Sequence, residues 1–244
     1  MRTRWIRRSV TLALVGAVLL TGGCGLIGPA KRIEGSAPLD RTITAIRVDS
    51  DSGSVTIEGD DDDASSLEWT ISLRSNRTVG PTYSIDGSVL ILSGCGSRCS
   101  VDYRVRVPVD VDVEGRTANG NIDLSDVGDV DLATTNGRVS LDGVTGRVMA
   151  SSTNGRIDGE DLSGSGVEVS TSNGSVELEL EQAQDVSASS SNGSIDVRLP
   201  DGSYRVEAET SNGQRDIRVP NSEGGRYLID LRTSNGSITV HPAD

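Results

Sequence analysis

The chain has 244 residues, of which 36 are acidic and 23 are basic, and its formal net charge is −13. A charge of this sign repels phosphates, which argues against nucleic acid as a partner. Aromatic residues make up 2 % of the chain and there is one histidine. A metal site built on imidazoles, a His-based catalytic triad or an aromatic-lined sugar cleft therefore lacks the residues that it needs.

The N-terminus has the pattern of an export signal. Residues 1–8 carry four arginines and no acid, residues 10–20 form an apolar run, and two glycines then precede Cys24. This order is typical of a signal peptide, and the run is shorter than the roughly 20 apolar residues that span a bilayer. A cysteine directly after small residues resembles the bacterial lipoprotein signal. That resemblance implies removal of residues 1–23, lipid attachment at Cys24, and anchoring to the outer face of the cell membrane. Ordinary secretion, with Cys24 as an incidental thiol, is the alternative.

Residues 24–39 are predicted to be a lipidated tether. They include Gly28-Pro29 and Ser36-Ala37-Pro38 and show no sustained hydrophobic period. Such a composition is typical of a flexible linker. We therefore expect this segment to join the membrane anchor to a folded body.

Residues 40–110 are predicted to form an N-terminal β cap or degenerate coils of the repeat that follows. Alternating apolar and polar residues predict strands in this part of the chain. The predicted strands cover residues 43–48, 54–57, 67–73, 88–92 and 101–109. Asp51-Ser52-Gly53 and Asp86-Gly87 look like degenerate copies of an Asn-Gly corner that recurs later in the chain.

Two features of this first half are candidates for chemistry. Cys95 and Cys99 form an even pair in an exported chain, which predicts a structural disulfide, with two free thiols as the alternative. The run from Asp60 to Asp63 is the densest acidic cluster. Its spacing is not that of a dedicated calcium loop. We expect a solvated loop there, and weak calcium binding is the alternative.

Residues 111–244 contain an internal repeat built on Asn-Gly. The seven pairs begin at Asn119, Asn136, Asn154, Asn173, Asn192, Asn212 and Asn235, at intervals of 17 to 23 residues. Six positions before each Asn stands Val or Ile, and two positions before it stands Ser or Thr. Three positions after it stands Ile or Val, with Arg215 as the one exception. Each unit is thus predicted to be a strand, a corner that needs the positive φ that Asn and Gly tolerate, and a second strand.

Two all-β architectures fit these units. In a β-solenoid each unit is one coil, and equivalent residues of neighbouring coils stack at about 4.8 Å, with the asparagines forming an amide ladder. In an antiparallel β-meander each Asn-Gly makes a hairpin turn. We favour the solenoid because the strands after the earlier corners are short and broken, as expected for short faces meeting at corners. At the C-terminus Pro242 cannot donate a ladder hydrogen bond, and we expect it to end the stack.

The segment Val105-Arg106-Val107-Pro108-Val109-Asp110, followed by Thr117-Ala118-Asn119-Gly120-Asn121-Ile122, resembles a bacterial family. This is the putative adhesin family of β-strand-repeat proteins, formally a domain of unknown function. The similarity covers roughly residues 40–240. It implies a β-solenoid, an exported location and surface adhesion, and the family supplies no catalytic residues to carry over.

The sequence contains no candidate catalytic residues. His241 is close to the chain end, where we expect it to be solvated, the serines lack a base partner, and a phosphate loop opening a helix is missing. We expect no catalytic, cofactor or metal site. The sequence favours a lipid-anchored surface protein with a structural or adhesive role, whose partner is a cell-envelope protein or polysaccharide. The alternative is a surface module that binds calcium or cell-wall polysaccharide.

Overall fold

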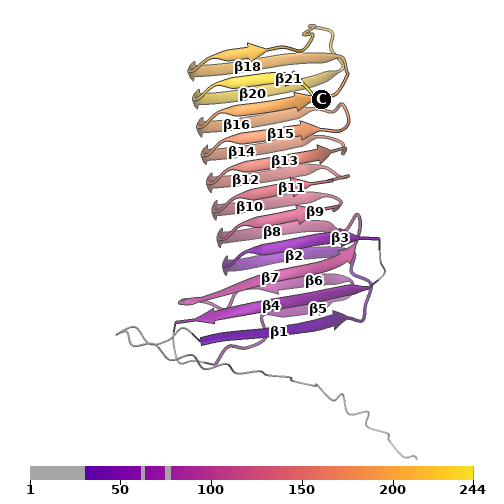
Figure 1. Cartoon of the computed structure of the whole chain (residues 1–244), viewed down its shortest axis with the longest axis vertical. Helices are drawn as coiled ribbons and strands as arrows, with labels where there is room; N and C mark the ends of the chain where they lie inside the picture. Colours follow the sequence, from indigo (N-terminus) through magenta and orange to yellow (C-terminus); the bar gives the residue numbers. More distant parts are fainter. Residues whose placement is uncertain (1–30, 62–63, 75–77, 244) are drawn as a thin grey trace, which may run out of the picture.

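The computed structural model describes residues 31–61, 64–74 and 78–243 of the chain. Every regular element in these ranges is a β-strand, and the strands form two sheets that enclose one core (Figure 1). No helix in these ranges is long and apolar enough to cross a membrane. The predicted signal peptide, residues 1–23, and the predicted lipid attachment residue Cys24 lie outside the described residues.

The two sheets run along the whole length of the stack. The larger sheet A contains, in spatial order, β1 (Lys31–Leu39), β4 (Ser65–Leu73), β7 (Cys99–Pro108), β3 (Val55–Asp60), β9 (Ile122–Ser125), β11 (Val139–Asp142), β13 (Ile157–Leu162), β15 (Val176–Leu180), β17 (Ile195–Leu199), β21 (Ile238–Pro242) and β19 (Arg215–Ile217). Sheet B contains β18 (Tyr204–Asn212), β20 (Tyr227–Asn235), β16 (Val186–Asn192), β14 (Val167–Asn173), β12 (Val148–Asn154), β10 (Val130–Asn136), β8 (Asp112–Asn119), β2 (Ala45–Ser52), β6 (Val89–Ser93) and β5 (Tyr83–Asp86).

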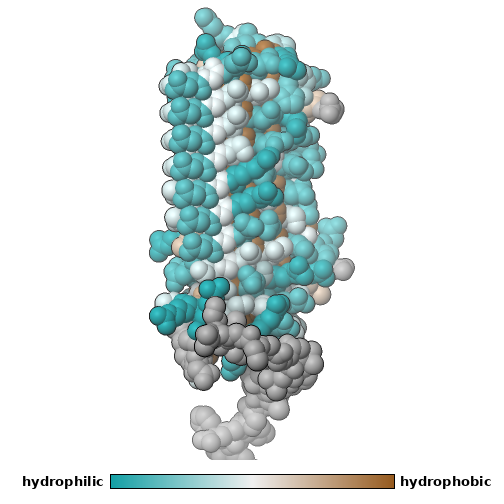
Figure 2. Space-filling view, turned by 60° about the vertical axis from the view of Figure 1, so that its left-hand side comes forward, coloured by the Kyte–Doolittle hydropathy of each residue, from teal (hydrophilic) through white to brown (hydrophobic). Residues whose placement is uncertain are grey.

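Each repeat contributes one strand to each sheet, and neighbouring repeats are parallel and in register. Val130 pairs with Val148 and Asn136 with Asn154, and the same register continues from β12 to β14 and from β14 to β16. The predicted β-solenoid is therefore confirmed, and the antiparallel meander is excluded for these repeats. Like residues lie over like residues, so Figure 2 shows columns of similar hydropathy parallel to the long axis.

The core consists of the aliphatic columns that the period of two places between the sheets. The column six positions before each Asn is buried along the stack and consists of Val113, Val130, Val148, Val167, Val186, Ile229 and Val206. The column three positions after the Asn is also buried and consists of Ile122, Val139, Ile157, Val176, Ile195 and Ile238. Each coil covers the apolar side chains of the next coil, which explains why the units occur as an array.

The corner glycines are required for a different reason from the one predicted. Of the seven glycines that follow the ladder asparagines, only Gly236 has a φ in the left-handed region, at 154°. The others have no room for a side chain. A Cβ on Gly155 would lie 1.8 Å from the carbonyl oxygen of Gly137, and one on Gly174 would lie 2.0 Å from that of Gly155. The close approach of successive coils, and not left-handed backbone, selects glycine here.

The N-terminal end is a cap whose strands lie partly antiparallel. β2 and β3 form the first coil, in register with β8 and β9, and Ser52 takes the place of the ladder asparagine. β1, β4 and β7 then extend sheet A with antiparallel pairings. The prediction of a tether over residues 24–39 is therefore wrong for Lys31–Leu39, which form β1 along the full length of β4. Asp86-Gly87 is also not a solenoid corner, because it joins the antiparallel hairpin β5–β6.

The C-terminal end has an order that the repeat does not predict. The last coil, β20 and β21, inserts between the coil of β16 and β17 and the coil of β18 and β19, which precedes it in sequence (Figure 1). Pro242 pairs with Leu199 inside the stack, and β19 lies beyond β21 on its other side. The prediction that Pro242 ends the stack is therefore wrong.

The coil of β18 and β19 ends the stack, and two side chains form hydrogen bonds with its backbone. Arg215 occupies the aliphatic position after the corner and donates to the carbonyl oxygen of Ala208 at 3.1 Å. Asn221, from the segment after β19, accepts from the backbone N–H of Val206 at 2.9 Å and donates to its carbonyl oxygen at 3.0 Å. The Asn221 amide thus imitates a neighbouring strand at the open edge of sheet B, where unpaired backbone groups would recruit other chains.

Candidate functional site

The Asn-Gly corners form a continuous amide ladder along one edge of the stack. Every ladder Asn except Asn119 donates from Nδ2 to the Oδ1 of the Asn in the adjacent coil, at 3.0–3.1 Å, and Asn119 donates to the carbonyl oxygen of Asp51 at 3.3 Å. In spatial order the ladder consists of Asn119, Asn136, Asn154, Asn173, Asn192, Asn235 and Asn212. The predicted ladder is confirmed, and it leaves Asn212 at one end.

A second ladder lies under the first, from the Ser or Thr two positions before each Asn. Thr171 and Ser190 donate to the carbonyl oxygens of Gly155 and Gly174, both at 2.9 Å, and Thr233 and Thr210 make the equivalent bonds. From Ser152 onward, the hydroxyl groups of this column donate to the glycine carbonyls of the neighbouring coil, whereas the buried hydroxyls of Thr117 and Thr134 have no hydrogen-bond partner among the described residues. This contact accounts for the Ser or Thr in the coils that make it.

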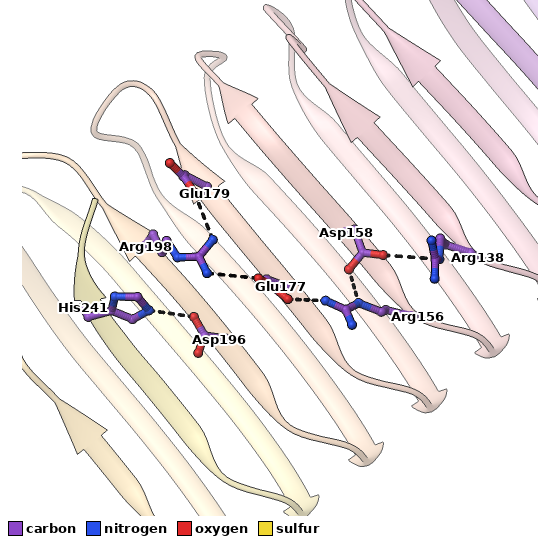
Figure 3. Close-up of polar contacts among 8 residues, drawn as sticks. All are labelled: Arg138, Arg156, Asp158, Glu177, Glu179, Asp196, Arg198 and His241. Carbon is purple, nitrogen blue, oxygen red and sulfur yellow. Dashed lines mark hydrogen bonds and ion pairs between the residues drawn. The ribbon is translucent and has the colours of Figure 1, made fainter. Parts of the chain in front are cut away.

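The outer face of sheet A carries a row of ion pairs between coils (Figure 3). Register places Asp158 beside Glu177 and Glu177 beside Asp196, so three carboxylates lie in one column. Arg156 pairs with both Asp158 and Glu177. Arg198 pairs with Glu177 at 3.2 Å and with Glu179 (Figure 3) at 3.0 Å. Without these arginines the stacked carboxylates would repel one another across each pair of coils.

The ion pairs hold the arginines in the charged form. Hydrogen bonds to Asp158 and Glu179 raise the pKa of Arg156 and of Arg198, respectively, above the ordinary value, and the neighbouring carboxylates add to this. Every carboxylate of this row that Figure 3 shows has a cationic or imidazole partner. The row therefore balances charge between neighbouring coils.

The sequence predicted that His241 lies in a solvated tail, and this prediction is wrong. His241 is part of β21, inside the stack, and its Nε2 lies 2.9 Å from the Oδ1 of Asp196 (Figure 3). Arg198 is its register partner on β17. The imidazole thus continues the row of charged contacts at the next coil.

The outer face of sheet B is different, because small hydroxyl residues cover its central coils. Ser151, Ser170 and Ser189 follow one another in register, and Thr153, Ser172 and Ser191 line the adjacent column. Towards the inserted coil the face is hollowed into a shallow depression of about 580 Å³. Its rim includes Ser189, Ser191, Ser234 and the ion pair Glu209–Arg232.

The cap holds the two cysteines and a buried tyrosine. Cys95 and Cys99 are joined by a disulfide, with Cα atoms 5.7 Å apart, within the usual range. The Tyr103 hydroxyl lies between the carbonyl oxygens of Thr82 and Ser93, at 2.5 and 2.7 Å. Burial raises the pKa of Tyr103 to about 12, against a smaller opposing effect of these hydrogen bonds. The tyrosine contacts join both ends of the β5–β6 hairpin to β7, and the disulfide joins the segment after β6 to the first residue of β7.

The acidic run is described only in part, because Asp62 and Asp63 lie outside the described residues. Asp126, in left-handed backbone with φ 54°, has a raised pKa because it is partly desolvated and because Asp142 and Asp61 lie nearby. Among the described residues no group of three or more His, Cys, Asp or Glu side chains is arranged to hold a metal ion.

The row of ion pairs was not predicted from the sequence. Aligning the coils on their asparagines places Asp158, Glu177 and Asp196 in one column and Arg198 and His241 in the next. The signal was therefore present in the repeat. It becomes visible only when positions in different coils are compared.

The family model described as Toastrack DUF4097 matches residues 40–242, which confirms the resemblance to the β-strand-repeat family. No curated protein matches the chain. Solved structures similar to it include a putative adhesin from Bacteroides fragilis, with 14 % identity over 87 % of this chain and 97 % of that chain and a TM-score of 0.45. A putative adhesin from Parabacteroides merdae has 12 % identity over 88 % and 97 %, with a TM-score of 0.43. A putative cell adhesion protein from Clostridium sporogenes has 14 % identity over 87 % and 100 %, with a TM-score of 0.38. Because the family model covers most of the residues, the chain belongs to the Toastrack DUF4097 family.

Proposed function

We propose that the mature chain is an exported protein, anchored to the outer face of the cell membrane by lipid on Cys24, with a structural or adhesive role and no catalysis. The observation that carries this proposal is the uninterrupted stack of parallel coils, from β2 and β3 to β18 and β19. Such an array makes a stiff body with long, regular outer faces. A lipoprotein-type signal at its N-terminus supplies the means of holding that body at a membrane.

The order of the chain orients the stack relative to the proposed anchor. Cys24 precedes the first residue of β1, Lys31, by seven residues. These can span at most about 25 Å. β1 lies at one end of sheet A and β19 at the other, and the eleven strands extend over about 48 Å at roughly 4.8 Å each. The N-terminal cap is thus held close to the membrane, and the coil of β18 and β19 is the distal end.

The charge of the mature chain favours this orientation. Removal of residues 1–23, with four arginines and no acid, changes the net charge from −13 to −17. Anionic headgroups repel a body of that charge. The stack therefore projects from the surface, and its distal coils and the hydroxyl-rich face of sheet B are presented to partners outside the cell membrane.

Anchoring is tested by metabolic labelling with palmitate. The wild-type chain should take up label, and the Cys24→Ala variant should not. A Cys95→Ala/Cys99→Ala variant is the matched control, because it removes two cysteines that are not proposed to carry lipid and should keep the label. Equal labelling of the wild type and the Cys24→Ala variant would overturn the proposal.

The role is tested by comparing wild-type cells, cells without the protein, and cells with the Cys24→Ala variant. An adhesive role predicts that both altered strains bind less to isolated cell-envelope polysaccharide or protein, with no new soluble product. A structural role predicts unchanged binding and greater sensitivity of the envelope to osmotic stress. Release of fragments from polysaccharide by the purified full chain would contradict a non-catalytic role.

A further inference from the structure

The seven Asn-Gly pairs differ in one backbone contact. In six of them the N–H of the glycine donates to the carbonyl oxygen of the Asn in the next coil, at 2.9–3.2 Å; these are Gly120, Gly137, Gly155, Gly174, Gly193 and Gly236. The seventh, Gly213, belongs to the coil of β18 and β19, beyond which the stack has no further coil. Its N–H has no hydrogen-bond partner among the described residues.

Asn212, the residue before Gly213, also has the least restrained side chain of the ladder. Asn154, in the middle, donates to the Oδ1 of Asn136 and accepts from the Nδ2 of Asn173. Asn212 donates to the Oδ1 of Asn235 at 3.0 Å, and its own Oδ1 accepts no hydrogen bond from the described residues. Both Asn212 and Gly213 are exposed. The coil of β18 and β19 therefore combines a glycine N–H without a partner among the described residues with an asparagine that makes one ladder hydrogen bond instead of two.

We propose that Asn212 is a site of spontaneous deamidation, which the ladder suppresses at the other six Asn-Gly pairs. The backbone nitrogen of Gly213 attacks Cγ of Asn212, a new N–Cγ bond forms, and the Cγ–Nδ2 bond breaks. The Gly213 nitrogen loses its proton, and Nδ2 leaves as ammonia. One water molecule then opens the resulting succinimide to aspartate or isoaspartate.

The hydrogen bonds of the stack explain the selectivity. The attack requires the Asn side chain to rotate towards the nitrogen of the following glycine. At Asn154 this rotation breaks two ladder bonds and the bond from the Gly155 nitrogen to Asn173. At Asn212 it breaks one ladder bond. Each additional hydrogen bond is worth a factor of roughly 2 to 13 in an equilibrium, so Asn212 should react about tenfold faster or more.

The product weakens the end of the stack. A carboxylate at position 212 has no proton to donate to the Oδ1 of Asn235. Asn235 cannot reverse its amide without losing its own bond to Asn192, at 3.0 Å. The terminal ladder contact is therefore lost. Deamidation thus marks the distal coil with a new charge and loosens it, without a change in the coils nearer the cap.

The chain supplies its own matched controls for a test. The sequence Thr-Ser-Asn-Gly surrounds both Asn212 and Asn235, so their intrinsic reactivity is the same. Cleavage after arginine places Asn154, Asn212 and Asn235 in separate peptides, residues 148–156, 206–215 and 233–244, each with one Asn-Gly pair. The full chain is aged at mildly alkaline pH, digested, and analysed by mass spectrometry for aspartate and isoaspartate in each peptide.

We expect Asn212 to deamidate about tenfold faster than Asn235 and Asn154 in the folded chain, and the three rates to converge in urea. Equal rates in the folded chain, or the same ratio in urea, would overturn the proposal. An Asn212→Asp variant gives a second readout. Hydrogen exchange should become faster in residues 204–217 and stay unchanged in residues 122–180, and exchange that is unchanged throughout would overturn the proposed loosening.

Discussion

The corner glycines allow a sharp test of how closely the coils approach, and Gly155→Ala is the most informative substitution. The added methyl group would lie 1.8 Å from the carbonyl oxygen of Gly137, where contacts under 3.0 Å essentially never occur. Gly155 is in the middle of the stack, so the strain cannot be released at an end. Gly224→Ala is the matched control, because its Cβ meets nothing within 4 Å.

The cost of Gly155→Ala follows from the contacts that must give way. The two coils must separate locally by about 1.2 Å, the difference between 1.8 and 3.0 Å. This weakens the bond from the Gly137 nitrogen to Asn154, the ladder bond from Asn154 and the bond from Ser152 to Gly137. At about 0.5–1.5 kcal/mol for each of the three bonds, with about 1–3 kcal/mol for overpacking, we expect a loss of about 2.5–7.5 kcal/mol.

The assay is equilibrium unfolding in urea, followed by far-UV circular dichroism. Gly224→Ala should change the free energy of unfolding by no more than about 0.5 kcal/mol. Because a repeat array can unfold in parts, intrinsic fluorescence is recorded as a second probe, and coincident transitions justify a single free energy. A loss below about 1 kcal/mol for Gly155→Ala, or equal losses for the two variants, would refute the close approach of the coils.

Three further predictions concern the cap and the distal end. Burial raises the pKa of Tyr103 from 10.0 to about 12. The protonated hydroxyl therefore contributes fully to the free energy of unfolding below about pH 10, and this contribution is lost as the pH rises towards about 12. Tyr103→Phe should flatten that part of the pH–stability curve, and an unchanged slope would contradict the buried hydroxyl. Replacing Cys95 and Cys99 by serine should lower the free energy of unfolding by about 2 kcal/mol, as expected for so short a loop. Alkylation of Cys95 or Cys99 in the unreduced wild type would contradict the disulfide. Arg215→Leu should increase self-association in sedimentation velocity relative to Arg215→Lys, because it places an apolar side chain at the open end of the core. Equal sedimentation of the two variants would contradict that role.

The repeat made the main architecture predictable. Apolar residues at fixed distances from each Asn-Gly indicated which side chains face the core, and the constant Ser or Thr indicated stacking near a tight corner. Parallel register follows because a slip of one residue would turn Val148 and its equivalents out of the core. The reason for glycine at the corner was not predictable, because the distance from Gly155 to Gly137 is a property of two coils together.

The equivalence of the coils made their stacking predictable, but for the same reason it left the order of the coils unpredictable. Val206 and Ile229 are equivalent residues, and either can lie over Val186. The pattern within a coil therefore contains no information on which coil is its neighbour. Arg215 was the one local sign, since a charged residue in an aliphatic column belongs at an open end. β1 was missed because its partner, β4, lies far along the chain.

Cysteine cross-linking tests the central claim, that parallel coils stack in register with the last coil inserted. In a Cys24→Ala background, Ser191→Cys is combined with Ser234→Cys or with Ser211→Cys. The first pair lies on the neighbouring strands β16 and β20, about 4.8 Å apart, within reach of a disulfide. The second pair lies two coils apart, at about 9.6 Å, which is too far for a disulfide. The structure predicts a disulfide between positions 191 and 234 and none between 191 and 211. The reverse result would show that the coils stack in the order of the sequence and would contradict the inserted coil.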